Sequence, residues 1–332
     1  MITDPRPPHS ELTRALSRRE ALARCVALAA SLCLPQLGGA RPSSQDPSSQ
    51  DPGNFRAIYG DDVLRARFKL FLTHVYHLYP EGPFHQLITT LSREHTSDQA
   101  VYEGLLSALP EIQPFLGSLR YALPSLSEQR EVISKQTLSL LEGRTTFERY
   151  LSIGTTGRYY GALSDALSFE RDPLFVSYQA PTYGLTDIID RGQVRKRGAF
   201  FDLNDYTPLT ANIERESVDL LTVYIGFHHA PLERRERFIA SCVEVLKPGG
   251  VLIVRDHDAF SPEYQHLVAL AHDVFNAGLG VSWADNHAEV RHFTTLADLS
   301  ARLEGHGLKP HGELLLQPGD PTINTLMRFD RA

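Results

Sequence analysis

The chain has 332 residues, of which 42% are hydrophobic and 22% are charged. This composition excludes a disordered or collagen-like chain and supplies apolar material for one or two sizeable cores. Lys and Arg number 33 against 40 Asp and Glu, a formal net charge of −7. Without a long basic run, a nucleic-acid partner is not expected, because phosphate neutralisation needs clustered cations, and a small-molecule ligand is favoured.

Residues 1–40 have the order of a twin-arginine export signal. Arg18 and Arg19 precede an apolar run over 25–34, and the small residues Gly38 and Ala40 follow it. Ten apolar residues are half of the roughly 20 that a bilayer span needs, so a removable signal is favoured over a stable membrane anchor. Cleavage after Ala40 would leave a periplasmic or other extracytoplasmic protein. The alternative is an amphipathic N-terminal helix on a cytoplasmic protein.

Two segments precede the main body of the chain. Residues 41–54 contain Ser-Ser-Gln-Asp-Pro twice in succession, at 43–47 and 48–52, and are too polar to form a core, which predicts a disordered linker. In 55–144 apolar residues recur at helical spacing and prolines interrupt them, which predicts a helical cap or lid.

From residue 145 the chain alternates between apolar strands and amphipathic helices. Strands are predicted over 149–153, 174–178, 199–203, 218–225 and 250–256. This alternation predicts a parallel α/β sheet with helices on its faces. The tail differs, because the extended runs 308–316 and 322–329 are separated by Gln-Pro-Gly-Asp-Pro and predict a hairpin at the sheet edge.

A glycine loop joins the first predicted strand of this region to its helix. Gly154 and Gly157 let the backbone approach a ligand closely, and the following helix start offers free N–H groups. The spacing is not the G-x-G-x-x-G of dinucleotide-binding folds. A purely structural turn is an equal alternative.

A second motif lies at the fourth predicted strand. Val218 to Ile225 leads into Gly-Phe-His-His-Ala-Pro, and a helix then leads to Leu-Lys-Pro-Gly-Gly at 246–250. Over about 145–332, this order resembles the class I S-adenosylmethionine-dependent methyltransferases, particularly the small-molecule enzymes of methyltransferase domains 11 and 25. The resemblance implies a Rossmann-like sheet of seven strands with a terminal antiparallel hairpin. It also implies methyl transfer from S-adenosylmethionine to an oxygen, nitrogen or carbon atom of a small molecule.

The resemblance further implies cofactor-binding residues at matching positions. The glycine loop would contact the methionine part of the cofactor through Gly154, Thr155, Thr156, Gly157 and Arg158. Asp205 matches the acidic position that receives the adenine amino group, with Asp202 as its rival and Asn204 between them. Either aspartate could instead be a solvated turn residue. Tyr224, Ile225 and Gly226 would lie beside cofactor and substrate.

The chain departs from the family pattern at two positions. Ser152 stands where the first loop commonly carries an acid, and Tyr178-Gln179 stands where a carboxylate usually holds the ribose. Gln179 still offers a hydrogen-bond acceptor, although without charge assistance. The alternative function is therefore a catalytically impaired ligand-binding protein on the same fold. The loop spacing and the terminal hairpin disfavour a nicotinamide-dependent oxidoreductase.

Candidate catalytic residues lie at the predicted carboxyl ends of strands four and five, where open α/β sheets bind ligands. They are His228, His229, Asp256 and His257. A histidine oriented by a carboxylate is suited to act as a general base near neutral pH. The alternative is a loop-structuring or hydrogen-bonding role. No metal is expected, because adjacent residues of a strand alternate faces and because the three cysteines form no C-x-x-C pair.

Overall fold

The computed structural model describes residues 53–76, 79–112, 123–155, 157–178, 180–181 and 196–332. The predicted export signal and all but the last two residues of the predicted linker lie outside these ranges. Among the helices described, none combines the length and apolar character that crossing a membrane requires.

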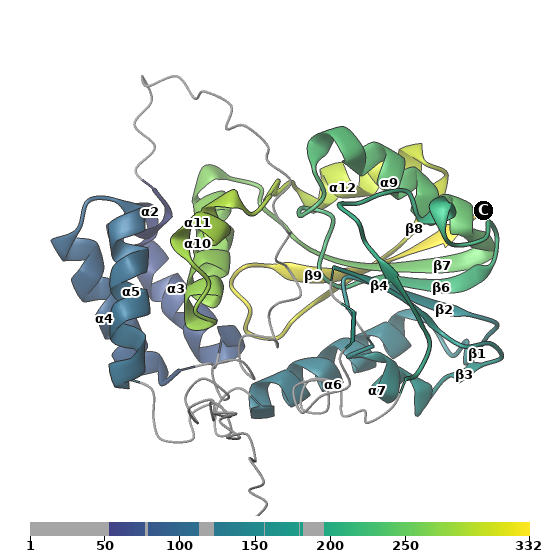
Figure 1. Cartoon of the computed structure of the whole chain (residues 1–332), viewed down its shortest axis with the longest axis horizontal. Helices are drawn as coiled ribbons and strands as arrows, with labels where there is room; N and C mark the ends of the chain where they lie inside the picture. The colour runs from purple at the N-terminus through teal and green to yellow at the C-terminus, as the bar shows by residue number, and fades with distance from the viewer. Residues whose placement is uncertain (1–52, 77–78, 113–122, 156, 179, 182–195) are drawn as a thin grey trace, which may run out of the picture.

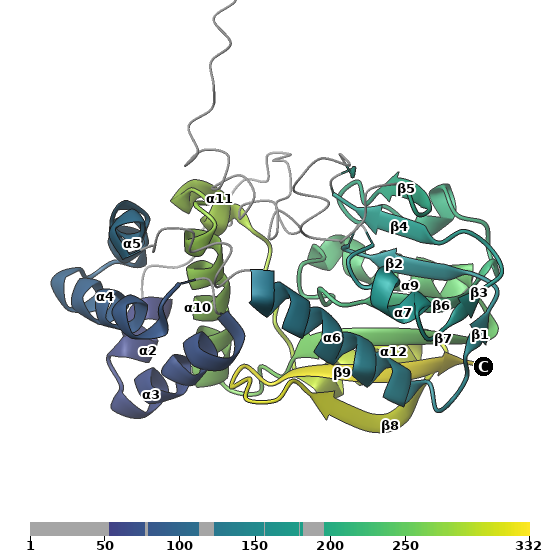
Figure 2. The same cartoon turned by 90° about the horizontal axis from the view of Figure 1, so that it is seen from below.

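The chain forms one sheet of seven strands, as the sequence predicts (Figures 1 and 2). In spatial order the strands are β5 (Ala199–Asp202), β4 (Leu174–Ser177), β2 (Tyr150–Ile153), β6 (Val218–Val223), β7 (Leu246–His257), β9 (Asn324–Arg331) and β8 (Leu308–Leu316). Only β9 is reversed, because it pairs antiparallel with both β7 and β8. Every residue of β6 is buried, as expected for a central parallel strand covered on both faces. A separate pair, β1 (Thr146–Phe147) and β3 (Ser168–Phe169), lies beside this sheet.

Helices cover both faces of the sheet (Figure 1). The helices α9 (Leu232–Val245) and α12 (Leu296–Gly305) pack on one face, where Leu221 and Val223 belong to the same core. The helices α6 (Leu123–Leu140) and α7 (Tyr160–Ser164) cover the other face, where Leu220 lies in a second core. A short 3-10 turn, η4 (Leu209–Ala211), precedes β6. Leu220 and Leu221 of β6 lie in different cores because successive side chains of a strand point to opposite faces of the sheet.

A second group of helices lies beyond the carboxyl ends of the strands (Figure 2). It comprises α2 (Asn54–Tyr59), α3 (Asp62–Phe71), the π-helical turn η2 (Leu72–Tyr76), α4 (Glu81–Glu94), α5 (Asp98–Ile112), α10 (Pro262–Gly278) and α11 (Trp283–Ala288). We call this group the helical cap. Its core joins residues of 55–109 to those of α10, such as Leu267 and Val274.

The segment 55–144 is therefore divided between two cores. Its first helices enter the cap, whereas α6 covers the sheet through Ile133 and Leu140. The cap in turn gains α10 and α11, which follow β7 in the chain. Its first helix begins at Asn54, one residue inside the predicted linker, and the Asn54 side chain donates to Asp273 of α10 at 2.9 Å.

One buried carboxylate fixes the opposite, amino-terminal edge of the sheet. Asp219 of β6 accepts hydrogen bonds from the backbone N–H groups of Glu148 and Arg149 at 2.9 and 2.8 Å. The Arg144 guanidinium donates to it at 3.1 Å. The entry to β2 is thereby held beside β6.

Replacing Asp219 by Ala should lower the free energy of unfolding by roughly 2–4 kcal/mol, because two backbone N–H groups lose their acceptors. Urea unfolding of the full chain measures this loss. The matched control is Asp62→Ala, which removes an exposed ion pair with Arg65 and should change stability by at most about 0.5 kcal/mol. Equal effects of the two substitutions would contradict the anchoring role.

Candidate functional site

The glycine loop after β2 is packed against the loop after β6. Gly154 has φ of +82°, and a Cβ placed there would overlap the side chain of Ile225. Gly157 has φ of +99°, and its Cβ would lie 3.1 Å from Cζ of Phe175 in β4. The positive φ angles favour glycine at both positions, and the loop lies close to its own protein neighbours. Glycine at 154 and 157 fits a purely structural turn and a cofactor-binding loop equally well.

The side chains of this loop face inward. The hydroxyls of Thr155 and Ser152 lie 2.7 Å apart, and both residues are buried. Arg158 is also buried and donates to Gln129 of α6 at 3.1 Å. Thr156, predicted to share the loop's role, lies outside the described residues. Ser152 therefore closes a contact within the loop at the position where the family commonly carries an acid.

The two candidate adenine residues have different structural roles. Asp202 Oδ1 accepts from the backbone N–H of Asn204 at 2.7 Å, which is the Asx turn expected of this residue type. The next three residues, from Asn204 to Tyr206, all have positive φ, at 42°, 52° and 59°. Asp202 thus stabilises a strained turn.

Asp205 instead faces a cavity at the sheet edge. Its half-exposed carboxylate pairs with the Arg234 guanidinium at 2.5 Å. Arg234 also donates to the backbone carbonyl of Asp205 at 2.8 Å, which fixes the turn against α9. The cavity is lined by Tyr178, Asp205, Ile225, His229, Pro231, Glu289 and Val290. Asp205 lines this cavity of about 20 Å³, whereas Asp202 does not, and Gln179 lies outside the described residues.

Tyr224 points away from this edge. Its hydroxyl lies 2.8 Å from Thr137 Oγ1 of α6, and its ring contacts Tyr159 with a centroid separation of 4.6 Å. Burial raises the pKa of Tyr224 well above its ordinary value. Only the backbone at this position is therefore available to a ligand.

The carboxylate of Asp256 organises the loop that follows β6. It accepts from His228 Nδ1 at 2.6 Å and from the backbone N–H groups of Phe227 and His257 at 2.8 and 2.9 Å. A Cβ at Gly226 would lie 2.5 Å from His228 Nδ1 and 2.8 Å from Asp256 Oδ1. The histidine–carboxylate contact therefore requires glycine at 226.

Burial sets the protonation of this pair. It lowers the pKa of His228 well below the ordinary value, with the nearby His229 and His257 adding to the effect. Burial also raises the pKa of Asp256, against the opposing influence of His257 and the N–H donors. The lowered pKa of His228 favours its neutral imidazole, whose Nδ1 contacts the Asp256 carboxylate. Its Nε2 is buried and has no hydrogen-bond partner among the described residues.

Three further imidazoles lie around His228. The ring centroids of His229, His272 and His257 are 4.2, 5.3 and 5.6 Å from that of His228. The Phe293 ring lies 5.0 Å away from it. His257 Nδ1 faces the Thr322 carbonyl at 3.1 Å, and burial lowers the pKa of His257 to about 4. The four predicted catalytic residues are therefore brought together.

His272 is a residue that the sequence analysis missed. It lies on α10, where the neighbouring Leu270, Ala271 and Val274 are buried in the cap core. A histidine within such an apolar helical face was the available signal. The approach of His272 to His228, 44 positions earlier in the chain, is a tertiary feature with no local signature.

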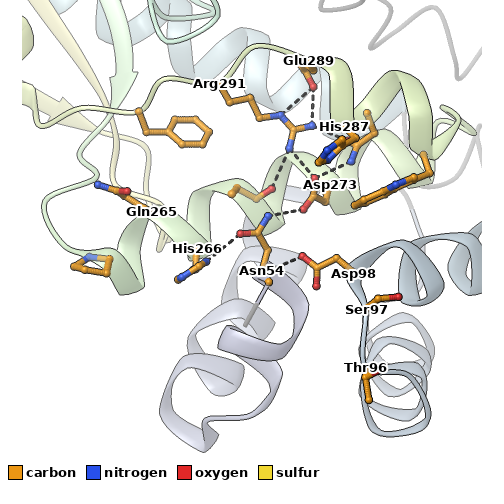
Figure 3. A pocket seen from close by; sticks show the side chains of 16 residues that line it. Asn54, Thr96, Ser97, Asp98, Gln265, His266, Asp273, His287, Glu289 and Arg291 are labelled. Carbon is orange, nitrogen blue, oxygen red and sulfur yellow. Dashed lines mark hydrogen bonds and ion pairs between the residues drawn. The ribbon is translucent and has the colours of Figure 1, made fainter. Parts of the chain in front are cut away.

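A larger cavity of about 740 Å³ lies between the first cap helices and α10 and α11 (Figure 3). Its polar wall is centred on Arg291, whose five N–H donors bond to Asp273, Glu289, Asn286 and the Ala269 carbonyl. Burial lowers the pKa of Arg291, but the Glu289 and Asp273 carboxylates outweigh this and raise it above the ordinary value. Phe293 lines this cavity and also contacts His228.

Comparison with known proteins agrees with this architecture. Residues 189–254 match the family of the methyltransferase domain, while no curated protein sequence matches the chain. The match covers about a fifth of the chain, and the strand order is the one that the resemblance to class I S-adenosylmethionine-dependent methyltransferases implies. The matched residues include Asp202, Asp205 and the two histidines after β6, but neither the glycine loop nor Asp256.

Three solved structures are similar to the chain. One is the 1,6-didemethyltoxoflavin-N1-methyltransferase of Burkholderia thailandensis, solved with 1,6-didemethyltoxoflavin and S-adenosylhomocysteine bound. It is 12% identical to this chain with a TM-score of 0.42, and the match covers 71% of this chain and 91% of that one. The N-methyltransferase NodS of Bradyrhizobium japonicum is 14% identical with a TM-score of 0.41, covering 62% and 96%. A possible exported protein of Bordetella parapertussis is 16% identical with a TM-score of 0.43, covering 87% and 99%.

Replacing Asp205 by Ala should weaken S-adenosylhomocysteine binding about 10- to 150-fold, because one charge-assisted hydrogen bond is worth roughly 1.5–3 kcal/mol. Calorimetric titration measures the change. The control is Asp202→Asn, which keeps an acceptor oxygen for the turn and should change the affinity by less than about threefold. A large loss confined to the Asp202 variant would assign the adenine contact to Asp202 instead.

Proposed function

We propose that this protein transfers a methyl group from S-adenosylmethionine to a small-molecule acceptor. The observation that carries the proposal is a buried contact at one edge of the sheet. His228, in the loop after β6, lies 2.6 Å from Asp256 at the end of β7. The Asp205 turn after β5 and the glycine loop after β2 border the same edge. These are the positions at which an open parallel sheet binds its ligands.

The geometry supports a small set of roles. Methyl transfer from a sulfonium is an in-line displacement, so the protein aligns nucleophile and methyl group and excludes water. A base is needed only when the acceptor arrives protonated. His228 is the candidate for that role, because the Asp256 carboxylate contacts its Nδ1 at 2.6 Å and orients the ring.

The cavity beside the cap is the proposed acceptor site. Its volume of about 740 Å³ lies in the range of small-molecule pockets. Trp283 and Phe293 supply apolar wall, and Phe293 links the cavity to His228. Because Arg291 already uses all five donors within the protein, it shapes this wall and does not serve as an anion clamp.

A catalytically impaired ligand-binding protein is the second candidate. The observation that favours it is Ser152, which stands where the family commonly carries an acid and whose hydroxyl is engaged by Thr155 at 2.7 Å. A protein of this second kind would retain a nucleoside site at Asp205 and lack turnover.

Calorimetric titration of the full chain tests the shared basis of both candidates. S-adenosylmethionine and S-adenosylhomocysteine should each bind with a stoichiometry of one, whereas NAD should give no binding heat, because the first loop lacks the dinucleotide spacing. The Asp205→Ala variant is the control for binding at this site. Binding of NAD alone would replace the proposal with a nicotinamide-dependent function.

We also propose that the protein is exported through its twin-arginine-like N-terminus. The mature chain should begin near Arg41 in the native host, and joint replacement of Arg18 and Arg19 by Lys should block export. N-terminal sequencing of protein from the extracytoplasmic fraction identifies the first residue of the mature chain. Cell fractionation shows whether the variant is exported. Recovery of wild-type protein that begins at Met1 or Ile2 in the cytoplasm would contradict export.

A further inference from the structure

Two histidines after β6 meet a third from the helical cap. One ring nitrogen from each of His228, His229 and His272 lies within 4.8 Å of the other two. The first two side chains are buried and the third is half-buried. In a tetrahedral zinc site with bonds of about 2.0–2.1 Å, ligand nitrogens are roughly 3.4 Å apart. The three nitrogens must therefore move closer together by up to about 1.4 Å when they bind one ion.

The three rings are already held by their Nδ1 atoms. His228 Nδ1 faces Asp256 at 2.6 Å, His229 Nδ1 lies 3.3 Å from the Val290 carbonyl, and His272 Nδ1 lies 2.9 Å from the Val268 carbonyl. Each contact favours the tautomer with its proton on Nδ1. Metal-ligating histidines typically show this arrangement, in which the second nitrogen donates to a carboxylate or carbonyl.

The buried charge behind these rings suits a dication. Asp256 lies behind His228, and Glu289 Oε1 lies 3.3 Å from His229 Nδ1. Glu289 and Asp273 share a single guanidinium, that of Arg291, at 2.7 and 2.6 Å. Three carboxylates, those of Asp256, Glu289 and Asp273, therefore lie around these rings together with the guanidinium of Arg291 and that of the buried Arg235.

We propose that His228, His229 and His272 bind one divalent first-row transition metal ion of the zinc type. Three imidazole nitrogens suit such ions, whereas Mg²⁺ and Ca²⁺ prefer oxygen ligands. A site with three protein ligands keeps a further position open for a small ligand. His257 is not part of the set, because its Nε2 already faces the Asn324 amide at 3.3 Å.

The sequence analysis expected no metal because adjacent residues of a strand point to opposite faces, but this argument does not apply to His228 and His229. Alternation of faces applies to residues of a strand, and β6 ends at Val223. His228 and His229 lie in the turn region beyond it, where both rings face His272. Binding of the ion is measured without S-adenosylmethionine, so failure of the metal site and failure of the proposed methyl transfer can be distinguished.

The test uses full-chain protein that has been stripped of metal with a chelator. Titration with Co²⁺, followed by its visible absorption, and with Zn²⁺, followed by calorimetry, should each show one tight site. His272→Gln should weaken binding by at least about 100-fold, because losing a ligand should cost no less than losing an outer-shell partner. The control is His306→Gln, which removes a histidine paired with Glu236 on the surface and should leave the affinity within about twofold.

The spectrum of the wild-type protein supplies a second criterion that does not depend on any variant. X-ray absorption of the zinc-loaded protein should show three imidazole nitrogens in the first shell, a result that stands even where His272→Gln fails to fold. Absence of a stoichiometric site in the wild-type protein would overturn the proposal. So would an unchanged affinity of folded His272→Gln, or a first shell with fewer than three imidazoles.

Discussion

The geometry of the functional edge depends on one buried carboxylate, that of Asp256 at the end of β7. Three N–H groups from Phe227, His228 and His257 converge on it. Because two of these donors belong to the loop after β6 and one follows Asp256 itself, the carboxylate joins the ends of two neighbouring strands. Gly226 permits the approach. A buried carboxylate without these donors would be costly, so the loop and the carboxylate stabilise each other.

A second buried network carries the same constraint into the cap. Glu289 lies between His229 and Arg291, and Arg291 continues to Asp273 on α10. Asp273 in turn accepts from Asn54 at the start of α2. The first ordered turn of the described chain is thereby connected to the histidines at the sheet edge. The cap is held to the site by the polar contacts of Glu289, Arg291 and Asp273 and by its apolar core. The cap is therefore a wall of the site rather than a separate domain.

Sequence patterns predicted the sheet well because each strand carries its own local signal. The buried run of β6 and the Pro-Gly-Asp turn before β9 specify strand and hairpin without reference to distant residues. The helical pattern of 55–144 is different, because a periodic apolar face shows that a helix is buried but not against what. The division between cap and sheet at α6 could not be predicted for that reason. His272 was missed on the same grounds, whereas the position of His228 and Asp256 at one carboxyl edge of the sheet was predicted from the strand order.

The two proposed uses of His228 compete for one nitrogen. Asp256 occupies Nδ1, so the lone pair on Nε2 is the only free basic site of the ring. A ring that coordinates an ion through Nε2 cannot at the same time accept a proton there. If the three-histidine site is filled, an acceptor molecule must therefore reach it already deprotonated or lose its proton to another group. His257 is poorly suited to that task, because Thr322 and Asn324 face its two nitrogens and burial holds its pKa near 4. An ion at this position would thus favour acceptors whose acidity is raised by coordination, whereas an ion-free site would favour acceptors that His228 itself deprotonates.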